Sequence, residues 1–305
     1  MSVARRAGYR LLGTRLDYFL HLRPAEWPIV AGHTALGYLL AVGLAGVRTG
    51  AHLAEALLGI ALWVVCLNGG TLALNSAFDR DEGDIAYLRR PPPPPRGLAV
   101  GALLLMLAGQ AAAVVLPSAY QIAYATCVVL SVLYSVPPMR LKAVAGADWI
   151  INMIGFGTLT PYAGWAATGL PLEPARGLAL IAFCPLFAAL YPLTQIYQLE
   201  EDTRRGDRTL ATALGVGGSL DAAAAALAVA FALFAGAGVA GGWDLGHHAW
   251  RWLVLTLALT TWLAVLLPWR RDAARLDAPE HQRGMYRALA AWAVTDLAVL
   301  AAFGG

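Results

Sequence analysis

The amino-acid sequence predicts an all-α polytopic membrane protein that crosses the bilayer nine times. Of its 305 residues, 59% are hydrophobic and only 13% are charged, and the mean hydropathy is +0.60. This composition is too apolar for a soluble globular protein. Several apolar runs approach the ~20 residues that a helix needs to span a bilayer. Strands of a membrane β-barrel would be shorter and would alternate in polarity, so helices are expected.

The nine expected spans follow one another closely, at 25–46, 54–78, 97–116, 119–137, 148–168, 177–199, 219–241, 249–268 and 285–303. With the N-terminus in the cytoplasm, nineteen Lys and Arg residues fall in cytoplasmic segments, and only Arg48, Arg176 and Arg251 fall outside. This distribution follows the positive-inside rule. It predicts a multi-pass protein of the inner (cytoplasmic) membrane. No pattern typical of nucleic-acid binding is present.

Residues 1–23 mix arginines with Leu, Tyr and Phe, and they lack the short apolar core and small-residue cleavage site of a signal peptide. They are expected to form an amphipathic helix at the cytoplasmic interface. Residues 24–305 then form a single transmembrane domain. The cysteines Cys66, Cys127 and Cys184 all fall inside expected spans, without metal-ligand spacing, and read as buried small side chains.

The stretch 68–97 carries the most chemistry, because an apolar run there leads directly into the acidic cluster 79–84 (DRDEGD). At ~100° per residue, one helix face carries four oxygen-bearing side chains: Asn68, Asn75, Asp79 and Glu82. Carboxylates at the end of a membrane helix are costly unless they face the bundle interior and meet cations. Mg²⁺ suits such ligands, completed by waters and substrate phosphates. The alternative interpretation is a solvated helix cap that sets topology.

Two proline-containing segments mark the neighbouring loops. The five prolines at 91–95 are expected to form a stiff polyproline II strut of about 15 Å, at ~3.1 Å per residue, which is either a rim over the acidic site or a spacer. The segment 134–142 (YSVPPMRLK) ends the fourth span and leaves Arg140 and Lys142 at the cytoplasmic surface. These cations either anchor the loop to anionic lipid or neutralise a bound diphosphate.

Polar stripes recur in the next two spans. The fifth opens with Asp148 and Asn152, four residues apart. The sixth is predicted to carry four polar side chains on one stripe: Tyr191, Gln195, Gln198 and Asp202. The spacing from Gln198 to Asp202 repeats that from Asn75 to Asp79, each pair at a cytoplasmic helix end and followed by arginines. Two such helices facing one another would aim oxygen ligands at one point, as magnesium ions around a diphosphate require.

Three motifs together resemble the UbiA superfamily of intramembrane prenyltransferases, namely 75–83 (NSAFDRDEG), 134–142 (YSVPPMRLK) and 201–210 (EDTRRGDRTL). The expected nine spans extend the likeness over nearly the whole chain. The resemblance implies a ring of nine helices around a lipophilic chamber, capped on the cytoplasmic side by two aspartate-rich motifs that bind Mg²⁺ and an isoprenyl diphosphate.

The sequence departs from the family pattern in both acidic motifs. The first usually reads NxxxDxxxD, but its last position here is Gly83, between Glu82 and Asp84. Helix geometry favours Glu82 as the replacement, unless Gly83 ends the helix and turns Asp84 inward. The second usually reads DxxxD, but its first position here is Gln198, which offers an amide oxygen and one negative charge fewer.

The resemblance implies ionisation of an allylic diphosphate, followed by attack of an electron-rich carbon of a lipophilic acceptor. The implied Mg²⁺ ligands are Asn75, Asp79, Glu82, Gln198 and Asp202. Fixed positive charge would come from Arg140, Lys142 and Arg208. The remaining substrate-binding candidates are Asn68, Tyr134, Asn152 and Tyr197, and Tyr191 joins the tyrosines as an aromatic face for the cation. Asp148 or Asn152 would orient the acceptor or take its proton.

Two rival interpretations stay open. A membrane terpene cyclase would use the same site but let the prenyl chain attack itself. A transporter would place its ionisable residues near the bilayer midplane, whereas here they gather at one face, so it is the weaker alternative. The sequence does not indicate the acceptor, the chain length or the oligomeric state. It also shows no partner for Asp296, which lies inside the last span. His33 lies inside the first span, and its side chain is expected to face the bundle and to be satisfied by a neighbouring residue.

Overall fold

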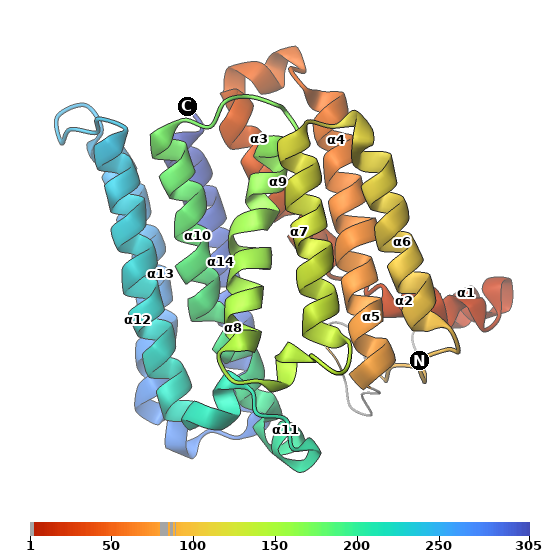
Figure 1. The fold of residues 1–305 in the computed structure, drawn as a ribbon. Helices are drawn as coiled ribbons and strands as arrows, with labels where there is room; N and C mark the ends of the chain where they lie inside the picture. Colours follow the sequence, from red (N-terminus) through yellow and green to blue (C-terminus); the bar gives the residue numbers. More distant parts are fainter. Residues whose placement is uncertain (1–2, 80–84, 86–87, 89) are drawn as a thin grey trace.

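A bundle of long helices makes up the computed structural model, which describes residues 3–79, 85, 88 and 90–305 (Figure 1). The bundle consists of α3 (Trp27–Thr49), α4 (Leu53–Ala61), the π-helical η1 (Leu62–Asn68), α5 (Gly69–Asp79), α6 (Leu98–Ala112), α7 (Ser118–Ser135), α8 (Ala147–Asn152), the π-helical η4 (Met153–Leu159), α9 (Thr160–Ala166), α10 (Pro174–Gln195), α12 (Leu210–Ala240), α13 (Ala249–Asp272) and α14 (Ala278–Phe303). Shorter elements are α1 (Val3–Leu12), α2 (Arg15–His21), η2 (Ala113–Val115), η3 (Leu141–Ala143), η5 (Ile196–Gln198), α11 (Leu199–Arg205) and η6 (Ala273–Arg275).

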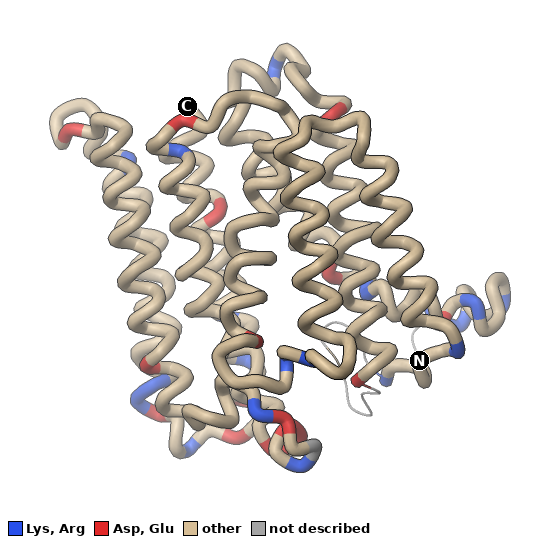
Figure 2. Tube along the Cα trace, in the orientation of Figure 1, with Lys and Arg blue, Asp and Glu red and all other residues tan. Residues whose placement is uncertain are grey.

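Eight helical stretches of the described chain are long and apolar enough to cross a membrane, which confirms the all-α, membrane-spanning class. They coincide with eight of the expected spans. The expected span at 148–168 corresponds to three short consecutive pieces, α8, η4 and α9, which are not among the eight. The exact number of nine therefore stays a prediction. Figure 2 shows that charged residues gather mainly at the end of the bundle that carries α11.

One helix begins earlier than expected. The seventh span was expected at 219–241, whereas α12 begins at Leu210, because Thr209 caps it by accepting a hydrogen bond at Oγ1 from the Thr212 amide at 3.2 Å. Gly215, with φ of +67°, interrupts the helix just inside this end. A positive φ there favours a residue without a Cβ. The sequence pattern alone did not reveal that the chain is helical on both sides of Gly215.

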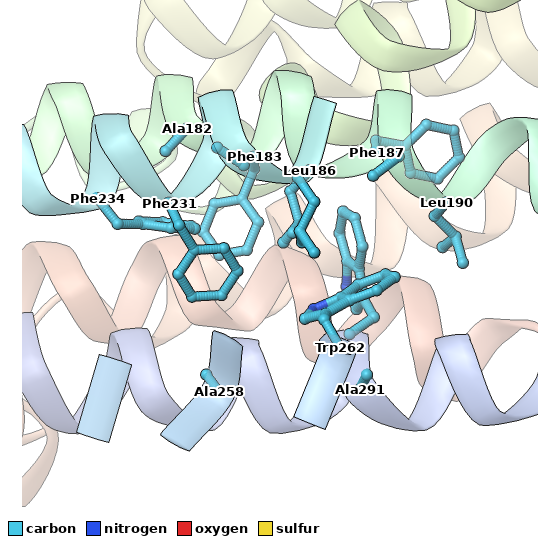
Figure 3. Close-up of a cluster of buried hydrophobic side chains, with 14 of the residues drawn as sticks. Ala182, Phe183, Leu186, Phe187, Leu190, Phe231, Phe234, Ala258, Trp262 and Ala291 are labelled. Atoms are coloured by element: carbon cyan, nitrogen blue, oxygen red, sulfur yellow. The ribbon is translucent and has the colours of Figure 1, made fainter. Parts of the chain in front are cut away.

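An aromatic core joins α10, α12, α13 and α14 (Figure 3). Phe183 and Phe234 pack edge to face with ring centroids 5.3 Å apart, and the indole of Trp262 donates to Thr295 Oγ1 at 3.0 Å. Elsewhere glycines allow close backbone approach: a Cβ at Gly37 of α3 would overlap the Pro161 carbonyl of α9.

The first and last long helices meet at a polar contact within the membrane span. His33 of α3 is fully buried, and its Nδ1 lies 3.2 Å from Oδ1 of Asp296 on α14. This contact supplies the partner that the sequence did not reveal for Asp296, and it confirms the expectation that His33 is satisfied by a neighbour. The pair links α3 to α14.

The N-terminal helices α1 and α2 lie beside the bundle at the end where α5 finishes (Figure 1). They hold the proline strut through its main chain. Arg5 donates to the Arg90 carbonyl at 2.9 Å, Tyr18 donates to the Arg96 carbonyl at 2.7 Å, and His21 Nε2 lies 3.1 Å from the Pro92 carbonyl. The strut is therefore bound to these two helices.

Candidate active site

Two adjoining cavities lie inside the bundle. The larger, which we call the chamber, has a volume of about 350 Å³ and is mostly apolar, with Trp63, Phe156, Phe187 and Trp292 among its walls. The smaller, which we call the polar pocket, has a volume of about 220 Å³. Six residues line both cavities: Arg23, Asn75, Tyr134, Tyr191, Thr194 and Tyr197. The two cavities therefore adjoin at this shared boundary.

Both predicted acidic helix ends reach the polar pocket. Asn75 and Asp79 line it from α5, and Gln198 and Asp202 line it from η5 and α11. This confirms that the two ends face one another. All four residues of the stripe predicted for the sixth span, Tyr191, Gln195, Gln198 and Asp202, line the polar pocket. The helix is not continuous, because α10 ends at Gln195 and a 3₁₀ turn separates it from α11. Glu82 and Asp84 lie outside the described residues.

The carboxylate of Asp79 meets two cations. Lys142 forms an ion pair with Asp79 Oδ1, and its Nζ also donates to Asn75 Oδ1 at 3.4 Å. Arg140 NH2 lies 3.7 Å from the same Asp79 oxygen. The Asp79 side chain is only 5% exposed. Carboxylate and cations thus lie together at the wall of the polar pocket, where an anionic ligand would meet both ammonium charge and metal-binding oxygens.

The loop after α7 positions these cations. Its prolines end the helix at Ser135, and Arg140 adopts a left-handed conformation with φ of +34°. Arg140 NH1 donates to Asp207 Oδ1 at 2.8 Å, and NH2 donates to Oδ2 at 3.4 Å. A bridge between Val144 and Arg208 holds the same two loops together. The guanidinium of Arg140 is therefore already used by Asp207, whereas Lys142 lines the pocket itself.

Asp148 has a different environment from the one expected for an acceptor-orienting group. It is fully buried and lines neither cavity. Its Oδ1 accepts from the Gly146 amide at 2.9 Å, and its Oδ2 accepts from Gln195 Nε2 at 3.0 Å and from the Leu210 amide at 3.1 Å. The carboxylate thereby joins the starts of α8 and α12 to the end of α10.

The other predicted residues divide between the cavities and the surface. Asn68 and Asn152 line the chamber, and Tyr197 lines both cavities. Arg208 is exposed and lines neither cavity, because the neighbouring Asp207 and Thr209 face inward instead. Its expected contact with a diphosphate stays a prediction that this geometry does not support.

Sequence reasoning missed Arg23. Its side chain is only 8% exposed and lies at the boundary of the two cavities, where NH1 is 3.6 Å from Glu26 Oε1. Within the part of the chain that the structure describes, Arg23 Nε has no hydrogen-bond partner. The sequence does show that Arg23 directly precedes Pro24 at the start of the first span. We used this arginine only to predict the orientation of the protein in the membrane.

The sequence profile of the UbiA prenyltransferase family matches residues 31–289. The chain belongs to this family. No curated protein matches the sequence. A match that covers the first to the last long helix confirms the resemblance carried by the three motifs and shows that this UbiA-family protein is an integral membrane protein.

Solved structures share its fold. A UbiA homolog from Archaeoglobus fulgidus bound to DMAPP and Mg²⁺ is 19% identical, with a TM-score of 0.62, over 91% of this chain and 98% of that one. A UbiA homolog from Aeropyrum pernix K1 is 18% identical, with a TM-score of 0.61, over 91% and 98%. A structure described for digeranylgeranylglyceryl phosphate synthase is 13% identical, with a TM-score of 0.67, over 95% and 98%.

The residues of the polar pocket fit Mg²⁺. They offer only oxygen ligands, and Asp79 already takes cationic partners. Among the described residues, no three His, Cys, Asp or Glu side chains form a ready-made metal centre. Mg²⁺ usually binds through one or two carboxylates, with waters and substrate phosphates completing its octahedron, so two aspartates with flanking amide oxygens suffice.

Proposed function

We propose that this UbiA-family protein transfers an isoprenyl chain from an isoprenyl diphosphate to an aromatic, quinone-precursor-like or other lipophilic acceptor, with release of diphosphate and dependence on Mg²⁺. One observation carries the proposal. The polar pocket, with its facing carboxylates and Lys142, adjoins an apolar chamber and shares six lining residues with it. An isoprenyl diphosphate has the same two parts, a polyanionic head and an apolar chain, joined at the bond that breaks.

The pocket residues divide the work on the head group. Asn75, Asp79, Gln198 and Asp202 would hold Mg²⁺, which supplies charge neutralisation of the diphosphate as a Lewis acid. Lys142 adds fixed positive charge where negative charge accumulates on the departing diphosphate. Arg140 acts one step away, by holding Asp207 and approaching Asp79. The apolar walls of the chamber keep water from the allylic cation.

Arg23 supplies positive charge at the boundary of the two cavities, where its side chain is 8% exposed and NH1 lies 3.6 Å from Glu26 Oε1. We place the acceptor in the chamber beside this boundary, next to the start of the prenyl chain.

The family relatives support the substrate class. The Archaeoglobus fulgidus homolog was solved with DMAPP and Mg²⁺, and also with GPP and Mg²⁺. Both ligands are allylic diphosphates. By the positive-inside bias, we place the N-terminus and the polar pocket on the cytoplasmic side of the inner membrane, with residues 1–23 at its interface and 24–305 as one transmembrane domain.

The decisive experiment incubates purified protein with Mg²⁺, a panel of isoprenyl diphosphates and a membrane lipid extract, and follows new prenylated masses. New masses that require both Mg²⁺ and the extract support prenyl transfer. A hydrocarbon product formed without extract would instead establish the terpene cyclase. Transport across proteoliposome membranes without any chemical turnover would contradict both enzymes. EDTA should abolish the products, and added Mg²⁺ should restore them.

A further inference from the structure

The two N-terminal helices, α1 and α2, expose arginines together with large apolar side chains. Residues 3–22 carry four arginines and a single acidic residue, Asp17, whose carboxylate accepts a hydrogen bond from the Tyr9 hydroxyl at 2.6 Å. Figure 2 shows basic positions along α1, beside the bundle and near the end of α5. The exposed side chains, which we call the basic–apolar surface, are Arg6, Arg10, Leu11, Arg15 and Phe19.

The arrangement of these side chains on α1 suits a membrane interface. One side of α1 packs on α2 at Gly8, where a Cβ would lie 3.0 Å from a methyl carbon of Leu16. Arg6 and Arg10 are one helical turn apart and therefore share a face, and the neighbouring Leu11 is 84% exposed. A short helix of this kind lies in the plane of the interface, with its arginines among anionic headgroups and its apolar side chains at the acyl boundary.

Exposed arginines also occur at the connection between α13 and α14, but two of them have acidic neighbours. Arg271 Nε lies 3.8 Å from Asp272 Oδ1, and Arg283 NH2 lies 3.4 Å from Glu280 Oε1. On α1 and α2, four arginines share one aspartate. An anionic surface would supply the counter-charge that this segment does not carry itself.

The same two helices hold a segment that reaches the polar pocket. Their three hydrogen bonds to the proline strut begin at the Arg90 carbonyl. Five residues before Arg90, Ile85 lines the polar pocket. Two backbone hydrogen bonds of 3.2 and 2.8 Å join Ile85 to Leu88, which is buried. Only a short length of chain therefore separates the bonds made by α1 from the wall of the pocket.

We propose that α1 and α2 bind an anionic phospholipid surface through the basic–apolar surface, and that this contact, passed on by the proline strut, holds Ile85 at the wall of the polar pocket. The effect on catalysis rests on the proposed function, because the polar pocket is where the diphosphate head would bind. Each arginine near an anionic membrane strengthens binding by roughly fivefold. The affinity for the diphosphate head thereby depends on the lipid headgroups beside the protein.

The first test examines the lipid contact without any substrate. The full-length protein is placed in nanodiscs of phosphatidylcholine, alone or mixed with phosphatidylglycerol, and amide hydrogen exchange is followed in residues 3–22 and at Ile85 and Leu88. Phosphatidylglycerol should slow exchange in both regions by about tenfold or more. A triple variant, Arg6→Gln with Arg10→Gln and Arg15→Gln, should lose this slowing. The matched control, Arg271→Gln with Arg275→Gln and Arg283→Gln, removes the same charge from the α13–α14 connection and should keep it.

The second test breaks the link between the helices and the strut. Tyr18→Phe combined with His21→Phe removes two of the three bonds to strut carbonyls and no arginine. Phosphatidylglycerol should still slow exchange in residues 3–22 of this variant, but not at Ile85 and Leu88. The dissociation constant of geranyl diphosphate, measured with Mg²⁺ in phosphatidylglycerol nanodiscs, should be severalfold higher than in wild type. The negative membrane repels the diphosphate equally in both proteins, so the difference isolates the link.

Four results would overturn the proposal. Equal exchange of residues 3–22 in the two membranes would mean that no anionic surface is bound, and wild-type slowing in the Arg6, Arg10 and Arg15 variant would mean that other groups bind it. Slowing that never reaches Ile85 and Leu88 would reduce α1 and α2 to an anchor. Inorganic phosphate that reproduces the slowing in phosphatidylcholine would indicate a phosphate site instead of a bilayer contact. If exchange responds as expected but geranyl diphosphate neither binds nor reacts, the proposed function fails and the lipid contact stands.

Discussion

The two buried carboxylates Asp79 and Asp148 have opposite surroundings. The side chain of Asp79 is 5% exposed and is paired with Lys142 and approached by Arg140. Asp148 is 0% exposed and is satisfied by uncharged N–H donors. The first lines the polar pocket and the second lines no cavity. Burial alone therefore does not identify a reactive carboxylate, whereas the chemistry of its partners does.

The largest expected loss of activity comes from removing a carboxylate at either acidic helix end, Asp79 or Asp202. Asp79→Ala and Asp202→Ala should each reduce prenyl transfer by about a hundredfold or more, because each removes an electrostatic group from the polar pocket. Folding should be retained. Product formation is measured beside size-exclusion profiles in the same detergent. Near wild-type turnover in either variant would remove that carboxylate from the site.

The same substitution at Asp148 should act on the fold instead. Asp148→Ala leaves three buried N–H donors without an acceptor, at about 1–3 kcal/mol for each donor that water does not reach. The thermal unfolding midpoint should fall well below that of Asp79→Ala in the same detergent. Equal midpoints for the two variants would mean that the distinction between a structural and a reactive carboxylate does not hold here.

An intermediate effect is expected from the two cations on the pocket side. Lys142→Ala should weaken diphosphate binding or slow its ionisation by roughly tenfold to a hundredfold. Arg140→Ala should cost less than about tenfold, because its guanidinium is held by Asp207 and is partly exposed. Turnover and diphosphate affinity in one detergent decide the order. If both variants bind diphosphate like wild type, these cations serve the lipid headgroups instead.

The smallest effect concerns the glutamine in the second acidic motif. Gln198→Asp adds one negative charge to the polar pocket and should lower the Mg²⁺ concentration for half-maximal turnover severalfold. A Gln198→Asp titration that matches wild type would indicate that this position does not contact the metal.

Periodicity was enough to bring the two acidic helix ends together. Asn75 and Asp79 lie on one turn of a continuous helix, so their spacing predicted a shared direction, and both line the pocket. The same reasoning described Asp148 as a further site residue, because a polar side chain at an inner helix face looks alike whether it meets substrate or backbone. Only the three-dimensional arrangement shows that the ends of α8, α10 and α12 converge on Asp148.

Long-range contacts were the other limit. Nothing in the local sequence indicates that Asp296 meets His33, because the partners are on the first and last long helices. Arg23 escaped notice for a similar reason, since its neighbours across the boundary come from distant spans. The presence of a membrane-spanning helix can be predicted from the local composition of the sequence. The residue that a given side chain contacts depends instead on how the helices pack.

The hold of α1 and α2 on the proline strut has a consequence for how this region can evolve. All three contacts reach main-chain carbonyl oxygens, at Arg90, Pro92 and Arg96. A carbonyl is present whatever the side chain, so these contacts depend on the path of the main chain and not on the side chains of the segment. Side chains of the strut can thus be exchanged as long as its main chain still presents these carbonyl oxygens to α1 and α2. In contrast, substitutions at Arg5, Tyr18 or His21 would each remove a hydrogen bond that the strut itself is unable to replace.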